Sequence, residues 1–182
     1  MIKEILVTAS LLGSGHLFGS SWQSFCEGVP DWPKGSEVPA ASKYAGVAKV
    51  VDGAFTKSKW DKMKGKDFSE GKWVIIDARS KPDRSVGKVP KSVMLTADYK
   101  NASKNEIKEA LVVKKVNKRL KSSYKSLADM TDVNYILFCN GKKCHRSSFG
   151  ACELRKLGVP ENKLFLMLGG FPEWKDRGYP TR

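Results

Sequence analysis

The sequence predicts an α/β domain with a mainly parallel central sheet flanked by helices. Strand-like and helix-like segments alternate from about residue 46 to the end of the chain. Two strand-like segments, 72–79 and 133–139, are continuous apolar runs, the pattern of strands that are buried on both faces. This alternation indicates strand–helix–strand units and therefore a parallel sheet. Chemistry in such sheets is found at the carboxyl ends of the strands.

The first segment, residues 1–21, has the order of a secretory signal peptide: a lysine near the start, an apolar run from Ile5 to Phe18, then small residues. Gly13 and other small or polar residues interrupt the run, which is too short and broken to span a bilayer stably. We expect cleavage near Ser21, a periplasmic or secreted protein, and no stable membrane span after processing. The alternative is an N-terminal helix or strand that packs on the domain.

Residues 22–45 are expected to form an irregular arm that leads into the domain at 46–182. Prolines in the arm exclude a long helix, and its aromatic side chains are expected to pin it to the domain, because they bury large areas. The prolines are Pro30, Pro33 and Pro39, and the aromatic residues are Trp22, Trp32 and Tyr44.

The domain is expected to contain five strands with helices between them. The strand-like segments are 46–53, 72–79, 92–97, 133–139 and 162–168. The helix-like segments begin with a short helix or turn at 55–65 and a lysine-rich helix whose apolar stripe consists of Ile107, Leu111, Val116 and Leu120. A helix at 146–158 follows, with Phe149, Cys152 and Leu157 facing inward and Gly158 at its end. A short helix is expected within 169–180.

The charge of the chain is strongly positive. Thirty-three lysines and arginines against 19 acidic residues give a net charge of +14, which favours an anionic partner: a small oxyanion, an acidic protein, a membrane surface or nucleic acid. No aromatic–basic RNA motif, basic zipper or zinc-ligand spacing is present, so we expect no nucleic-acid partner, no metal and no cofactor. The alternative is a solvated lysine surface without a dedicated partner.

The candidate nucleophile is Cys139, which ends the strand at 133–139. The residues that follow include a glycine, two lysines, a histidine and Arg146, and a helix begins at about Ser147. Loop amides, the positive end of the helix and the cationic side chains all favour a thiolate, the nucleophilic form of cysteine. The alternative is a cysteine that serves as a small core residue.

Four motifs in the same order resemble the rhodanese-like sulfurtransferases over about residues 46–181. They are "VIIDARS" at 74–80, "GKVPKSVML" at 87–95, "FCNGKKCHRSSFGA" at 138–151 and "LMLGGFPEWKDRGYP" at 166–180. The resemblance implies that Cys139 takes a sulfane sulfur from a small anion of the thiosulfate or polysulfide type and passes it to a thiol or a cyanide-like acceptor.

The resemblance also implies roles for other residues. The loop is expected to hold the persulfide through Asn140, Gly141, Lys142, Lys143, Cys144, His145, Arg146 and Ser147. Arg79 either contacts the anion or makes a structural ion pair, Asp77 is expected to be structural, and Trp174 is expected to lie in the core.

The chain departs from the family pattern in the cysteine loop and in the motif at 87–95. The family has Cys-x4-Arg where this chain has six residues between Cys139 and Arg146, so the cradle is wider and suits a bulkier anion or a protein partner. Lys88 stands where the family has a histidine. The spacing also differs by one residue from the Cys-x5-Arg loop of related phosphatases.

The other cysteines leave alternatives open. Cys144 is a resolving thiol that attacks a Cys139 persulfide or sulfenic acid, a partner in a protective disulfide, or an inert loop residue. Cys152 is expected in the core, and Cys26 has no evident partner, although an oxidising compartment would permit a bond. His145 is expected to be an exposed loop residue that makes a cationic contact, and the alternative is a residue that assists proton transfer.

Three function hypotheses remain from the sequence. The first is an exported sulfurtransferase, the second is a thiol–disulfide redox protein that uses Cys139 and Cys144, and the third is a non-catalytic module that docks an acidic partner. The basic segment 114–121 predicts that binding to such a partner would weaken with salt.

Overall fold

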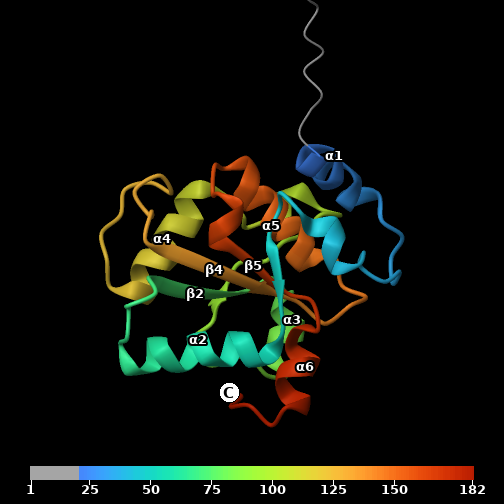
Figure 1. Ribbon diagram of the computed structural model, residues 1–182. Coiled ribbons are helices and arrows are strands. Elements are labelled where there is room, and N and C mark those ends of the chain that lie inside the picture. The colour runs from blue at the N-terminus through green and yellow to red at the C-terminus, as the bar shows by residue number, and fades with distance from the viewer. Residues whose placement is uncertain (1–20) are drawn as a thin grey trace, which may run out of the picture.

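The computed structural model describes residues 21–182, so the expected signal peptide lies outside the described residues apart from its last residue. The described chain forms three layers, with a sheet between two layers of helices (Figure 1). Helices α1, α4 and α5 lie on one side of the sheet, and α2 and α6 lie on the other. No helix in this part of the chain has the length and apolar character needed to cross a bilayer.

The elements alternate along the chain, as expected. The strands are β1 (Lys49–Val51), β2 (Lys72–Asp77), β3 (Val93–Met94), β4 (Val133–Phe138) and β5 (Leu164–Met167). The helices are α1 (Ser21–Gly28), α2 (Gly53–Gly65), α3 (Lys81–Ser85), α4 (Glu109–Leu120), α5 (Arg146–Lys156) and α6 (Gly170–Asp176).

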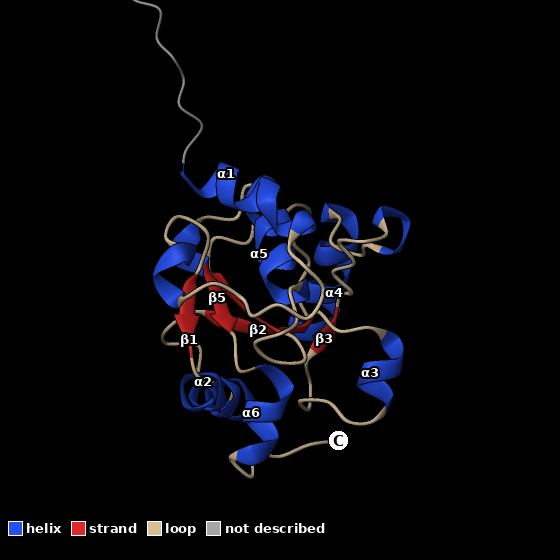
Figure 2. Ribbon diagram, turned by 90° about the vertical axis from the view of Figure 1, so that its right-hand side faces the viewer, coloured by secondary structure: helices blue, strands red, loops and turns tan. Residues whose placement is uncertain are grey.

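The sheet has the order β1-β5-β4-β2-β3, and every neighbouring pair is parallel. This confirms the predicted fold class. Strand β4 is the middle strand between β5 and β2, and all six of its residues are buried. Helices cover both faces of the sheet (Figure 2). The chain after β4 therefore leaves the centre of the carboxyl edge.

Side chains that alternate along the strands build two apolar cores. On one face Ile76 and Leu137 pack with residues of α4, α5 and the arm. On the other face Ile75 and Ile136 pack with residues of α2 and α6, including Trp174. Because consecutive strand residues point to opposite faces, a buried strand needs apolar residues at every position.

Several elements differ from expectation in their extent. The arm begins with helix α1, because its first proline, Pro30, comes only after that helix has ended. The segment at 55–65 is part of a full helix of 13 residues, which the Asp52 carboxylate caps by accepting a bond from the Phe55 amide. The third strand is only two residues long.

The lysine-rich helix also differs from the predicted stripe. Helix α4 begins at Glu109, so Ile107 lies before it, and the buried residues of the helix are Val112, Val113 and Val116. Leu111 and Leu120 are only partly buried against the same core.

Candidate functional site

Cys139 lies directly after the central strand and is 1% exposed. The amide of Ala78 bonds to the Phe138 carbonyl, and the amide of Phe171 bonds to the Cys139 carbonyl at 2.8 Å. The backbone at Cys139 is thus held between the end of β2 and the start of α6. Neighbouring parts of the carboxyl edge fix the position of the sulfur.

Gly170 allows this close approach of two backbones. Its φ is +64°, a left-handed value that favours glycine. A Cβ there would collide with the Cys139 carbonyl oxygen and with the amide nitrogen of Gly141. The glycine of the closing motif at 166–180 therefore shapes the cysteine loop directly.

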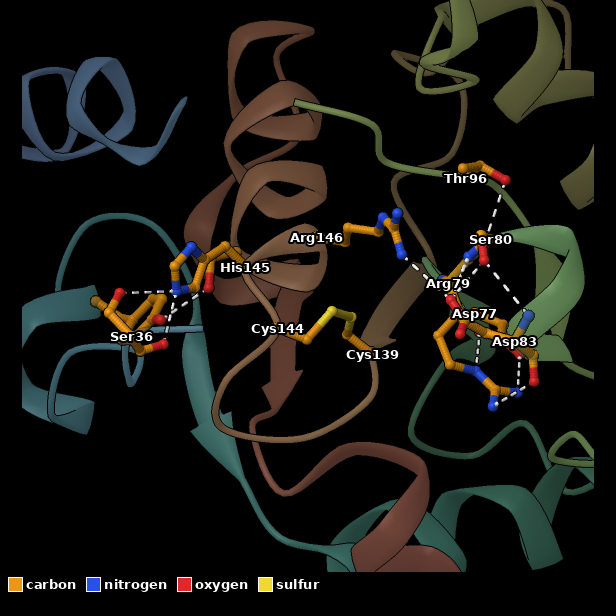
Figure 3. Close-up of a disulfide and its surroundings, with 12 residues drawn as sticks. Ser36, Asp77, Arg79, Ser80, Asp83, Thr96, Cys139, Cys144, His145 and Arg146 are labelled. Carbon is orange, nitrogen blue, oxygen red and sulfur yellow. Dashed lines mark hydrogen bonds and ion pairs between the residues drawn. A yellow bond between two sulfur atoms is a disulfide. The ribbon is translucent and has the colours of Figure 1, made fainter. Parts of the chain in front are cut away.

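Cys139 and Cys144 are joined by a disulfide, with their Cα atoms 6.1 Å apart (Figure 3). That separation is within the range that disulfides allow. A turn closes the loop between them, because the Cys144 amide bonds to the Gly141 carbonyl at 3.0 Å. In this state neither sulfur is a thiolate, so nucleophilic chemistry at Cys139 requires reduction.

Arg79 makes an ion pair rather than facing outward to an anion. Its guanidinium is 1% exposed and donates from Nε and Nη2 to the Asp77 carboxylate, each at 2.8 Å. Further bonds go to the carbonyls of Asp83 and Gly87, and the guanidinium lies 4.2 Å from the ring centre of Phe171. Of the two roles expected for Arg79, the structure therefore shows the structural pairing, with Asp77 as its partner.

Arg146 opens helix α5 and turns toward Asp83, with 3.2 Å between Nη1 and Oδ2 (Figure 3). Burial alone raises the pKa of Asp83, but the Ser80 hydroxyl, the Asn140 amide and the Arg146 charge outweigh it, so the pKa is lowered. Asp83 thus connects α3 to the loop at Asn140 and to the start of α5.

His145 is not the exposed residue that we expected. The side chain is 1% exposed, because the arm covers it. Nε2 lies 3.0 Å from the Ser36 carbonyl oxygen, and the Trp32 ring contacts the imidazole edge to face at 5.0 Å. A carbonyl accepts only, so Nε2 carries the proton, and the buried Nδ1 has no partner among the described residues.

The arm fixes the loop and the helix after it at further points. The Val38 amide donates to the Lys142 carbonyl at 2.7 Å. The hydroxyls of Tyr44 and Ser148 lie 2.8 Å apart. Burial raises the pKa of Tyr44 to about 12, so this hydroxyl remains neutral near physiological pH.

A second disulfide joins the arm to the same helix. Cys26 of α1 and Cys152 of α5 are both fully buried, and their Cα atoms are 5.4 Å apart. Cys152 therefore lies in the core, as predicted, and Cys26 has a partner that the sequence did not reveal. Of the arm residues near the loop, Ser36 and Val38 carry no local sequence signal for this role.

The other predicted residues lie around the loop in different environments. Asn140, Lys142 and Lys143 are exposed, whereas Ser147 is buried in the first turn of α5. Trp174 lies fully buried in the core beneath the sheet and donates from its indole to the Pro180 carbonyl. The predicted loop residues are thus contiguous in space, and Arg79 and Trp174 lie in the supporting structure.

A cavity of about 620 Å³ lies between the arm, the segment 98–104 and the cysteine loop. Cys144 and His145 line it, whereas Cys139 does not. Its charged lining consists of Lys34, Lys100, Lys104, Lys143 and Arg146 against a single carboxylate, that of Asp98. Within residues 21–182 no group of three or more His, Cys, Asp or Glu side chains is arranged to hold a metal ion.

Comparison with known proteins gives a family match. The sequence matches the family model for the rhodanese-like domain over residues 62–177. No curated protein matches the sequence significantly. Since the family model spans more than half of the chain, it carries the assignment.

Three of the solved structures with a similar fold are compared with this chain by organism, sequence identity and coverage. Protein BH2092 of Bacillus halodurans is 17% identical, with 78% of this chain and 80% of that chain covered and a TM-score of 0.48. Thiosulfate sulfurtransferase of Pseudomonas aeruginosa is 15% identical, with 89% and 23% covered and a TM-score of 0.49. Ygr203w of Saccharomyces cerevisiae, a homolog of single-domain rhodanese and the Cdc25 phosphatase catalytic domain, is 17% identical, with 71% and 80% covered and a TM-score of 0.48.

Proposed function

Because the chain belongs to the rhodanese-like domain family, we propose that it is a sulfurtransferase that carries sulfane sulfur as a persulfide on Cys139. The observation that best supports this proposal is the position of Cys139, at the carboxyl end of the central strand and at the start of the loop that leads into α5. The loop that follows Cys139 and the start of α5 contain Lys142, Lys143 and Arg146, and loop amides and cationic side chains stabilise an anionic sulfur where they lie near it.

The proposed reaction has two transfers. The Cys139 thiolate attacks the outer sulfur of thiosulfate, the sulfur–sulfur bond of the donor breaks, and sulfite leaves with the electron pair. An acceptor thiolate then attacks the terminal sulfur of the persulfide, and Cys139 leaves as the thiolate. Charge is conserved in both steps, and no metal or cofactor takes part.

A second role, sulfide release through Cys144, is favoured by the bond between the two cysteines. In this route the Cys144 thiol attacks Cys139 of the persulfide, the protein disulfide forms, and one hydrogen sulfide leaves. The cycle then needs a thiol reductant to restore Cys139.

We propose that the protein acts outside the cytoplasm, as expected from residues 1–21. Support comes from the buried Cys26–Cys152 disulfide, because such bonds persist in oxidising compartments and are rare in the cytosol. Mass spectrometry of the exported protein would show a mature chain that begins near Trp22 if the leader is removed.

The sulfurtransferase proposal is tested by intact mass after reduced protein has been incubated with thiosulfate. Cys144→Ser should gain the mass of one sulfur atom, and Cys139→Ser should not. A Cys139→Ser protein that gains sulfur as readily as Cys144→Ser would refute the proposal. If Cys144 resolves the persulfide, wild-type protein should release sulfide and return to the disulfide, whereas Cys144→Ser should keep the added sulfur.

A further inference from the structure

We propose that the oxidised site is opened by a low-molecular-weight thiol bearing two or more carboxylates, which binds in the cationic cavity and attacks Cys144. The cationic cavity is the 620 Å³ space that Lys34, Lys104, Lys143 and Cys144 help to line. This inference rests on the proposed function, because the group released by the attack is the Cys139 thiolate.

Accessibility decides which sulfur is attacked. Cys139 is 1% exposed, and its carbonyl is tied to the start of α6 by the Phe171 amide. Cys144 is half-buried and lines the cavity. Thiol–disulfide exchange depends on which sulfur a thiolate can reach, so an incoming thiol forms its bond to Cys144.

The charges of the cavity select the thiol. Lys34 comes from the arm, Lys104 from the 3-10 turn at 102–104, and Lys143 from the cysteine loop. Within residues 21–182 none of these three lysines makes an ion pair, whereas Arg146, which also lines the cavity, is paired with Asp83. Asp98 is the single carboxylate of this lining. Uncompensated positive charge in a cavity concentrates anions and raises their association rate.

The cavity is also suited to a small molecule rather than to a single ion. Its volume lies within the range of about 300–1,000 Å³ that small-molecule sites occupy. The lining also supplies polar groups that can bond to a molecule of several atoms, among them the side chains of Tyr99, Asn101 and Asn140.

The reduction is balanced by two thiols. The first thiolate bonds to the Cys144 sulfur, the bond to Cys139 breaks, and the electron pair leaves on Cys139 as a thiolate. A second thiolate attacks the bound thiol's sulfur, and Cys144 leaves as a thiolate. Two small thiols are oxidised to one small disulfide, and the protein disulfide gains two electrons.

The test measures the reduction rate of the oxidised mature protein with mercaptosuccinate, which carries two carboxylates, and with neutral 2-mercaptoethanol. Rates are divided by the concentration of each thiolate, and samples are acid-quenched, alkylated and analysed by mass. We expect mercaptosuccinate to react on the order of tenfold faster per thiolate, with the advantage decreasing at high ionic strength. Equal rates per thiolate would overturn the proposal.

Charge reversal tests whether the lysines of the cavity cause the selectivity for mercaptosuccinate. The double variant Lys34→Glu, Lys104→Glu changes two exposed lysines outside the cysteine loop and should remove most of the selectivity for mercaptosuccinate. The matched control is Lys49→Glu, Lys125→Glu, which makes the same charge change at exposed positions at the start of β1 and before β4. An equal loss of selectivity in both variants would assign the effect to net charge and overturn the proposal that the cavity selects the thiol.

Peptide mapping identifies the sulfur that is attacked. Trypsin cleaves after Lys142 and Lys143, so Cys139 and Cys144 fall in separate peptides. With limiting mercaptosuccinate the thiol adduct should be on Cys144 and the alkyl label on Cys139. The opposite distribution would overturn the proposed attack.

The two proposals can fail independently. Cys144→Ser cannot form the loop disulfide, so persulfide formation on its Cys139 reports sulfur transfer without any need for a reductant. If that variant takes up sulfur but the wild-type protein shows no thiol selectivity, the cavity proposal fails and the sulfurtransferase proposal stands. If the variant takes up no sulfur, the proposed function fails even where the selectivity is found.

Discussion

At the scale of single residues, Gly170 determines how closely α6 approaches the cysteine loop. Gly170→Ala should destabilise the protein by more than the roughly 1–2 kcal/mol of a left-handed alanine, because its Cβ also meets the Cys139 carbonyl. Denaturant unfolding measures the loss.

The matched control is Gly178→Ala. Gly178 has a similar φ of +68° but no neighbouring atom within 4 Å of an added Cβ, so only the conformational cost applies. Equal losses in the two variants would mean that the contact with the loop adds nothing.

Asp83 gives a pH dependence at the residue scale. Its pKa is lowered in the folded protein, so its contribution to stability is present above the unfolded value near 3.8 and is lost as the pH falls through the lower folded value. Asp83→Asn should therefore be less stable than wild type at neutral pH, and the difference should shrink toward pH 2. Urea unfolding at several pH values measures it, and a difference independent of pH would contradict the assignment.

The residue scale also shows which parts of the site are readable from sequence. Cys139 and its loop could be predicted because a buried strand, a cationic loop and a helix are contiguous in the chain. The burial of His145 could not, because it depends on Ser36 and Trp32, more than a hundred positions away. The sequence left two roles open for Arg79, an anion contact and a structural ion pair, and only the distance from Arg79 to Asp77 in the structure distinguishes them.

At the scale of elements, the Cys26–Cys152 disulfide holds the arm on α5. Its sequence separation is 126 residues, and closing so long a loop restricts the unfolded chain by about 5 kcal/mol in the chain-entropy description. Cys26→Ser should lower the unfolding free energy by several kcal/mol and make residues 29–45 more sensitive to protease.

The loop disulfide provides the comparison. Cys139 and Cys144 are only 5 residues apart, for which the same description gives about 2 kcal/mol. Cys144→Ser should therefore lose less stability than Cys26→Ser and leave the arm resistant to protease. A larger loss in Cys144→Ser would contradict the anchoring role of the long-range bond.

Elements were predicted best where the local pattern was strong. The buried strands β2 and β4 follow from continuous apolar runs, whereas β3 is shorter than predicted, because only Val93 and Met94 pair in register with β2. Helix α1 was not predicted, although the prolines that disfavour a helix in the arm all lie after its last residue, Gly28. The bond from α1 to α5 has no local signal at all.

At the scale of the whole molecule, the net charge of +14 should accelerate the reaction of anionic reagents with the reduced Cys139. In Cys144→Ser, iodoacetate should alkylate Cys139 faster relative to iodoacetamide than it alkylates free cysteine. We expect a ratio raised on the order of tenfold at low salt and approaching that of free cysteine at high salt. A ratio that does not change with salt would show that the molecular charge does not act at the sulfur.

Anchoring the arm through Cys26 also has a consequence for biosynthesis. Cys26 emerges from the ribosome long before Cys152, and the two cysteines of the loop are synthesised in between. If the protein is exported, as we propose, oxidation during translocation would offer Cys26 two premature partners, and pairing with Cys139 would consume the nucleophile. We expect the yield of competent molecules to depend on a disulfide isomerase that returns such chains to the correct pairing.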